Sequence, residues 1–166
     1  MWSESPVGED ALVRIGLEPG LAGALLHTRS VVHAELGADL ERGDTAPWIL
    51  TEGGTFAVSA PLSGMLHQPN GLLHHQPQRL CARPLDDGWL YTLRVSPNSA
   101  EFGTLLSAGA AARLYDADSA RFLDALQQAL ADVGSGSSAS SPATLPEVAD
   151  TLGPVRYFSL LRGTYG

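Results

Sequence analysis

Residues 61–90 read PLSGMLHQPNGLLHHQPQRLCARPLDDGWL, and the turn signals in this stretch decide the fold. Groups of Pro, Asn, Asp, Ser and Gly with standard turn chemistry occur at 61–64, 69–71 and 86–88. The segments that adjoin these turns have the length and apolar content of strands. We therefore expect β-structure here, with short strands at 65–67 and 89–95.

The chain before residue 61 has the same organisation. Turn signals at 18–20, 42–44 and 53–54 separate short runs that are rich in apolar residues. A short helix is expected at 20–27, where Leu21, Ala24 and Leu25 share one face. Strands at this spacing are typical of a small β-sandwich or barrel. The strands expected from these runs cover residues 11–17, 28–33, 46–51 and 56–60.

The pattern changes to helical spacing after residue 96. Ser96-Pro97-Asn98 is a helix-start signal, and the apolar residues that follow at helical spacing are Phe102, Leu105 and Leu106. A longer helix is expected at 118–133. Its single apolar stripe, which we expect to pack on the β-structure or on a partner, consists of Phe122, Leu123, Leu126 and Leu130.

Residues 134–143 have the Gly-Ser composition of a flexible linker. The segment after this linker is expected to fold back or to reach a neighbouring subunit, because its apolar residues need a surface to cover. Those residues are Tyr157, Phe158, Leu160, Leu161 and Tyr165. We therefore divide the chain into a β domain with its short helices (1–114), an added helix (115–133), the linker (134–143) and a C-terminal extension (144–166).

The composition limits the function. The 166 residues are 44% hydrophobic, which is enough for the core of one ordinary domain. The formal net charge is −8, so nucleic acids and anionic membranes are unfavourable partners. All 10 basic residues are arginines, and lysine is absent from the sequence. Without an ε-amino group the chain cannot form a Schiff base or carry biotinyl-lysine or lipoyl-lysine.

The sequence also predicts a compartment. Cys81 is the single cysteine, which excludes an internal disulfide. The first residues lack the basic and apolar regions of a secretory signal, and no run reaches the roughly 18 apolar residues of a membrane span. The expected location is the cytoplasm.

Several short motifs occur in a consistent order along residues 11–114. They are the pair Ile15-Gly16, ELGADLERGDT at 35–45, APLSG at 60–64, Asn70, Pro77, Pro84, GWL at 88–90 and EFGTLL at 101–106. In this order and spacing they resemble the glycine cleavage system H protein family, whose members are lipoyl carriers. The resemblance implies a mainly β fold, the barrel-sandwich hybrid, with C-terminal helices.

The chain departs from this family at the residue that carries the lipoyl group. An ungapped count from Gly43 to Pro61 places the family's modified lysine on Gly53, which cannot form an amide with lipoate. The family's glutamate three residues earlier corresponds to Leu50. Since the chain has no lysine that a shifted register could supply, it is expected to bear no cofactor and to be unable to act as a lipoyl carrier.

The hairpin around this position is nevertheless expected to persist. Gly53-Gly54 is typical of a two-residue hairpin turn, because glycine tolerates positive φ at both central positions. In carriers of this fold the tip of the hairpin meets the ligase and the client enzymes. The residues expected to form a partner-binding tip are therefore Thr51, Glu52, Gly53 and Gly54. The alternative is that the glycine pair only closes a pair of strands.

The sequence leaves three functions open. The first is a non-lipoylated, H-protein-like interaction or regulatory subunit whose protein partners are enzymes that handle lipoyl carriers. The second is a small-molecule or metal-binding module with His67, His74 and His75 as ligands. The third is a structural subunit that forms a homo-oligomer through the C-terminal extension.

Other chemistry has little support in the sequence. His74 and His75 are expected in a loop, and the spacing of Cys and His residues is not that of a structural zinc site, so no metal is expected. The sequence has no Gly-x-Ser-x-Gly elbow, phosphate-binding loop or dinucleotide fingerprint. We therefore do not expect an enzyme.

Overall fold

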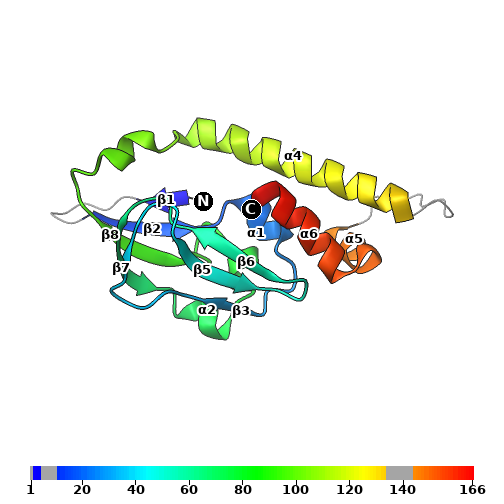
Figure 1. Ribbon diagram of the computed structural model, residues 1–166, viewed down its shortest axis with the longest axis horizontal. Coiled ribbons are helices and arrows are strands. Elements are labelled where there is room, and N and C mark those ends of the chain that lie inside the picture. The colour runs from blue at the N-terminus through cyan, green and yellow to red at the C-terminus, as the bar shows by residue number, and fades with distance from the viewer. Residues whose placement is uncertain (1, 5–10, 134–143) are drawn as a thin grey trace.

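The computed structural model describes residues 2–4, 11–133 and 144–166 as two β-sheets with helices on more than one side of them (Figure 1). The linker expected at 134–143 lies outside the described residues. The strands are β1 (Trp2–Glu4), β2 (Ala11–Gly16), β3 (Ser30–Val32), β4 (Asp39–Leu40), β5 (Thr45–Leu50), β6 (Thr55–Ser59), β7 (Gly64–Pro69) and β8 (Tyr91–Val95). The helices are α1 (Pro19–Ala24), α2 (Leu72–His75), α3 (Arg79–Ala82), the 3₁₀ helix η1 (Ala100–Thr104), α4 (Ala108–Val133), α5 (Leu145–Leu152) and α6 (Pro154–Tyr165).

The strands form two antiparallel sheets around the core. Five strands are ordered β1-β2-β8-β7-β4, and three are ordered β3-β5-β6. Each strand expected from the turn signals occurs, with its ends within two residues of the expected ones. The two sheets do not close into one barrel, and with the C-terminal helices they confirm the expected mainly β barrel-sandwich hybrid.

Strand alternation builds the core. In β6 the side chains of Phe56 and Val58 are buried between exposed neighbours, as the two-residue period of a strand requires. The register places Ile49 of β5 opposite Phe56, and this buried cross-strand pair stabilises the three-stranded sheet.

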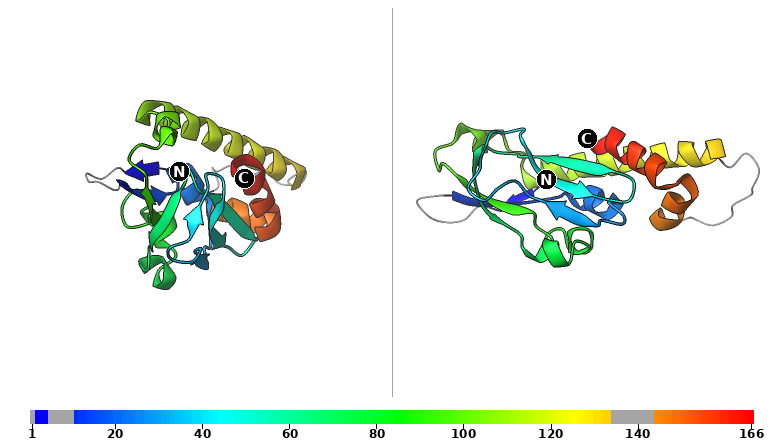
Figure 2. Two further views of the ribbon diagram at one scale, coloured as in Figure 1. Left: turned by 60° about the vertical axis from the view of Figure 1, so that its left-hand side comes forward. Right: turned by 60° about the horizontal axis from the view of Figure 1, so that its bottom comes forward.

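Helix α4 is longer than expected. It begins at Ala108 rather than at residue 118, so the division expected at residue 114 falls inside one continuous helix. Residues 108–117 are rich in alanine, which favours helix without providing an apolar stripe. In two views α4 runs along the outside of the molecule, over α6 and past the sheets (Figures 1 and 2). Within the described residues, no helix has both the length and the apolar character needed to cross a membrane.

Two details of the expected helices are wrong. Leu123 is 49% exposed while Phe122 is buried, because adjacent residues of an α-helix point about 100° apart and the buried face of α4 is too narrow to include both. Leu105 and Leu106 are also exposed, since only η1 forms after the helix-start signal and both residues follow it.

The C-terminal extension folds back on its own chain. Helix α5 starts with a capping box between Thr144 and Glu147, and Gly153 separates it from α6. The face of α6 that carries Tyr157 and Phe158 is buried. Folding back was one of the two arrangements expected for the apolar residues of the extension, and here they pack against other parts of the same chain.

The carbonyl of Leu90 joins the two sheets just before β8. It accepts hydrogen bonds from the Asn70 backbone N–H and from Nε2 of His33, each at 2.9 Å. Asn70 follows β7, and His33 follows β3 of the other sheet. The buried Asn70 side chain extends this junction, because its Nδ2 donates to the carbonyls of Asp87 and Trp89 at 2.8 and 2.7 Å.

Replacement of Asn70 should therefore destabilise the fold. In Asn70→Ala the carbonyls of Asp87 and Trp89 lose their donor, and we expect the free energy of unfolding to fall by about 2 kcal/mol. Denaturant unfolding would measure this change. The control is Asn98→Ala at an exposed turn, with an expected change below about 0.5 kcal/mol, and equal losses in both variants would contradict the role of Asn70.

His33 should make stability depend on pH. Burial lowers the pKa of His33 below its ordinary value of 6.5, so in mildly acidic solution the unfolded chain binds a proton that the folded chain does not. The contribution is complete above pH 6.5 and is lost as the pH falls toward the folded pKa. We expect lower denaturation midpoints at about pH 5.5 than at about pH 7.5. A difference of the same size in His33→Gln would rule out this residue as the cause.

Candidate functional site at the hairpin tip

The tip of the β5–β6 hairpin consists of residues Thr51, Glu52, Gly53 and Gly54. The Thr51 backbone N–H donates to the carbonyl of Gly54 at 2.9 Å, and the Thr51 hydroxyl donates to the same oxygen at 3.0 Å. Thr51 and Gly54 are thus the flanking pair, and Glu52 and Gly53 are the central residues of the turn. The expectation that Gly53 and Gly54 are the two central residues is wrong, because the pairing of Leu50 with Thr55 sets a different register.

Glu52 is the exposed residue of the tip. Nη2 of Arg29 donates to its Oε1 at 2.6 Å, and the Arg29 backbone N–H donates to the carbonyl of Leu50 at 2.8 Å. The Arg29 guanidinium lowers the pKa of the Glu52 carboxyl group, which is therefore ionised at neutral pH. The tip thus presents a fixed pair of opposite charges to solvent.

Helix α6 lies directly on the two glycines. A Cβ at Gly53 would lie 2.2 Å from the carbonyl oxygen of Pro154 and 2.5 Å from Cβ of Phe158. A Cβ at Gly54 would lie 2.6 Å from the Phe158 ring. Close approach of α6 accounts for glycine at residue 53, and at residue 54 it adds to a backbone φ of 159° that residues with side chains rarely adopt. A side chain at either position is incompatible with α6 in this place.

The end of α1 forms the second wall of the site. The buried Glu18 carboxylate caps α1, since it accepts hydrogen bonds from the backbone N–H groups of Gly20 and Leu21. The carbonyl of Ala24 in the last turn accepts a hydrogen bond from the Tyr157 hydroxyl of α6 at 2.9 Å. Tyr157 is buried, and burial raises its pKa, so the hydroxyl stays protonated and remains a donor.

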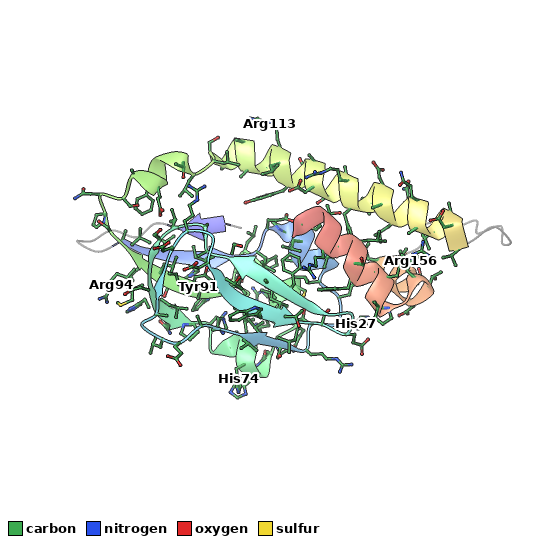
Figure 3. All side chains as sticks on the ribbon, viewed as in Figure 1. His27, His74, Tyr91, Arg94, Arg113 and Arg156 are labelled. Carbon is green, nitrogen blue, oxygen red and sulfur yellow. The ribbon has the colours of Figure 1, made fainter. Side chains whose placement is uncertain are left out.

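A cavity of about 50 Å³ remains between α1, the tip and the C-terminal helices. Its lining is mainly apolar and includes Leu26, Gly53 and Phe158, while His27, Glu52 and Asp150 bring polar groups to the rim. His27 lies on the side of the hairpin that faces α5 and α6 (Figure 3). This volume corresponds to a few water molecules and is well below that of ordinary small-molecule pockets.

The structure does not assemble the three histidines considered as ligands. His67 lies on β7, where Nη2 of Arg94 is 3.5 Å from its Nδ1. His74 and His75 lie in α2 with their rings 4.9 Å apart, so the expectation of a loop is wrong because the segment after Asn70 forms one helical turn. Arg94 and His74 project from different places on the surface (Figure 3). Among the described residues, no three His, Cys, Asp or Glu side chains form a group that could hold a metal ion.

Comparison with known proteins places the chain in a family. The sequence profile described as "Glycine cleavage H-protein" matches residues 5–118, which is more than half of the chain. The chain belongs to the glycine cleavage H-protein family. The match includes the β5–β6 hairpin and ends within α4, so α5 and α6 lie outside the part that defines the family.

Individual relatives cover similar parts of this H-protein family member. The glycine cleavage system H protein of Edwardsiella ictaluri is 34% identical over 74 residues, which are 45% of this chain and 57% of that protein's length. The H protein of Rippkaea orientalis is 33% identical over 100 residues, 58% of this chain and 74% of that protein. The crystal structure of an H protein from Mycobacterium marinum has the same fold, with a TM-score of 0.50, 24% identity and coverage of 56% of this chain and 71% of that one.

The sequence identifies the residues of the tip but not the helix, α6, that packs on it. Thr51, Glu52, Gly53 and Gly54 come together as expected, while partner binding by this tip stays a prediction. The residues missed are those of α6 that lie on the tip, above all Pro154 and Phe158. The adjacent aromatic residues Tyr157 and Phe158 signal a docking face, but nothing in their spacing indicates which surface they contact.

The hydrogen bond from Tyr157 to Ala24 should hold α6 in place. We expect Tyr157→Phe to lower the free energy of unfolding by about 1 kcal/mol, because the buried carbonyl of Ala24 loses its donor. Denaturant titration measures this loss. In Thr164→Ala, which removes a hydroxyl bonded within α6 to Leu160, the change should stay below about 0.5 kcal/mol. If Tyr157→Phe is as stable as the wild type, the bond does not hold α6.

Proposed function

We propose that this H-protein family member bears no lipoyl group and acts as a protein-interaction or regulatory subunit. The observation that carries the proposal is the absence of lysine from the 166 residues, together with the ungapped count that assigns Gly53 to the position of the family's modified lysine. The position of α6 supports it, because a side chain at residue 53 would occupy the same space as Pro154 and Phe158. The family scaffold is thus retained while the attachment point is lost.

The proposed partners are enzymes that handle lipoyl carriers, including those of glycine cleavage. Two features of the site support protein recognition rather than catalysis. The charge of Glu52 on the turn lies beside that of Arg29, which precedes β3, and together they offer a specific polar contact. The net charge of −8 favours association with a basic partner surface. The proposal takes the cytoplasm as the compartment, as the sequence predicts.

Binding to purified enzymes tests this function. We expect immobilised wild-type chain to bind a glycine cleavage enzyme or a lipoate ligase, and Glu52→Arg to weaken that binding at least about tenfold, because it reverses the exposed charge of the tip. Surface plasmon resonance measures both affinities. The matched control is Asp116→Arg, which makes the same charge change at an exposed position of α4 and should leave the affinity unchanged.

Two further measurements complete the test. After incubation with lipoate, ATP and a lipoate ligase, the intact mass of the chain should stay constant, while a lysine-containing H protein gains one lipoyl group. Addition of the chain should also change the turnover of the enzyme that binds it. Absence of binding to every enzyme of this class, or equal weakening by Glu52→Arg and Asp116→Arg, would contradict the proposal.

A further inference from the structure

The surface covered by α6 has the features of a site that binds a helix. It consists of the tip, residues 51–54, and the end of α1 with the loop after it, residues 24–27. We propose that this tip surface is a docking site for an amphipathic helix, and that α6 occupies it in the free protein. A helix from another protein then reaches the part of this surface at Gly53 and Gly54 only by displacing α6, while Glu52 stays exposed. This inference goes beyond the proposed function, since it concerns a contact within the chain and needs no enzyme partner.

The docked face of α6 is buried and apolar. Tyr157, Phe158 and Leu161 are 5%, 8% and 1% exposed, and their spacing places them on one side of the helix. Val155, on another side of α6, is 71% exposed. Phe158 covers the glycines of the tip, and the Tyr157 hydroxyl donates to Ala24. The occupant is therefore recognised by two consecutive aromatic residues and a leucine one turn later.

The two glycines make this docking selective. The distances of 2.2 Å and 2.6 Å from the added Cβ atoms mean that one methyl group at residue 53 or 54 would collide with α6. A tip that carries side chains, as a lipoyl-lysine tip does, cannot accept α6 in the same position. The docking helix and the Gly-Gly tip are matched to each other.

Several features allow α6 to leave as a unit. Gly153, with φ 78°, separates α5 from α6 and provides a flexible joint. The cavity of about 50 Å³ shows that the contact with the tip surface is not completely filled. Besides the Tyr157 hydrogen bond, α6 makes polar contacts with α4, namely the exposed pair of Arg156 and Asp132 at 3.3 Å and a hydrogen bond between Tyr165 and Ser119. Apolar contacts supply most of the remaining binding, and they include the packing of Tyr157 and Tyr165 against Phe122 of α4.

A single methyl group should release α6 from the tip surface. In full-length Gly53→Ala we expect the amides of residues 157–161 to exchange hydrogen at least about tenfold faster than in the wild type. The control is Gly163→Ala, because a Cβ at this position of α6 has no atom within 4 Å. In this variant the same amides should stay protected. Unchanged protection of α6 in Gly53→Ala, with the change confined to hairpin amides, would overturn the proposal.

A peptide tests whether the emptied surface binds a helix from another molecule. Full-length Phe158→Asp leaves the tip intact but places a charge on the docked face, so a labelled peptide of residues 144–166 should bind this variant. It should not bind the wild type, whose surface is occupied. In the double variant Phe158→Asp, Gly53→Ala the affinity should fall at least about tenfold.

The peptide experiment also has results that overturn the proposal. The first is that the peptide does not bind Phe158→Asp, although this variant keeps the near-ultraviolet circular dichroism of its β core. The second is that the peptide binds the wild type as tightly as it binds Phe158→Asp. The third is that adding Gly53→Ala to Phe158→Asp does not change the affinity for the peptide. All of these measurements use the purified chain alone. Their failure would therefore leave the proposed enzyme partners untouched, and failure to find such partners would leave the docking of α6 untouched.

Discussion

Helix α6 lies where it does because residues 53 and 54 have no side chains. The carbonyl of Pro154 and the ring of Phe158 occupy the volume that a Cβ would need at either residue. This contact accounts for the burial of Phe158 and borders the cavity beside the tip. Tyr157 packs in addition against Phe122 of α4, with ring centroids 5.6 Å apart. The absence of two Cβ atoms thus sets how closely α6 approaches the hairpin.

The hairpin can serve as a fixed base for α6 because the two sheets are tied together elsewhere. The Leu90 carbonyl receives donors from His33 and Asn70, which follow strands of different sheets. Glu18 fixes the start of α1, so the carbonyl of Ala24 is held in position for Tyr157. The site therefore depends on contacts made far from the tip in the sequence.

The sequence was sufficient for the β part of the fold and for the location of the tip. Turn residues mark most ends of the six expected strands, while the short strands β1 and β4 were not expected. Motifs such as Asn70 and the GWL at 88–90 lie within the part of the chain that matches the H-protein family. The sequence alone was not sufficient to predict contacts between segments that are distant along the chain. The apolar character of Phe158 predicts burial, but the choice of Gly53 as its contact depends on where α4 and α5 carry the chain. Short elements were also missed, as with His74 and His75, because a single helical turn leaves no periodic pattern.

The contact between α6 and Gly53 also limits which substitutions this chain could accept over evolutionary time. A lysine at residue 53 would send its long side chain into space that the C-terminal helix already fills. The substitution would break an established helix contact. Residue 53 and the position of α6 can therefore change without loss of stability only if both change together.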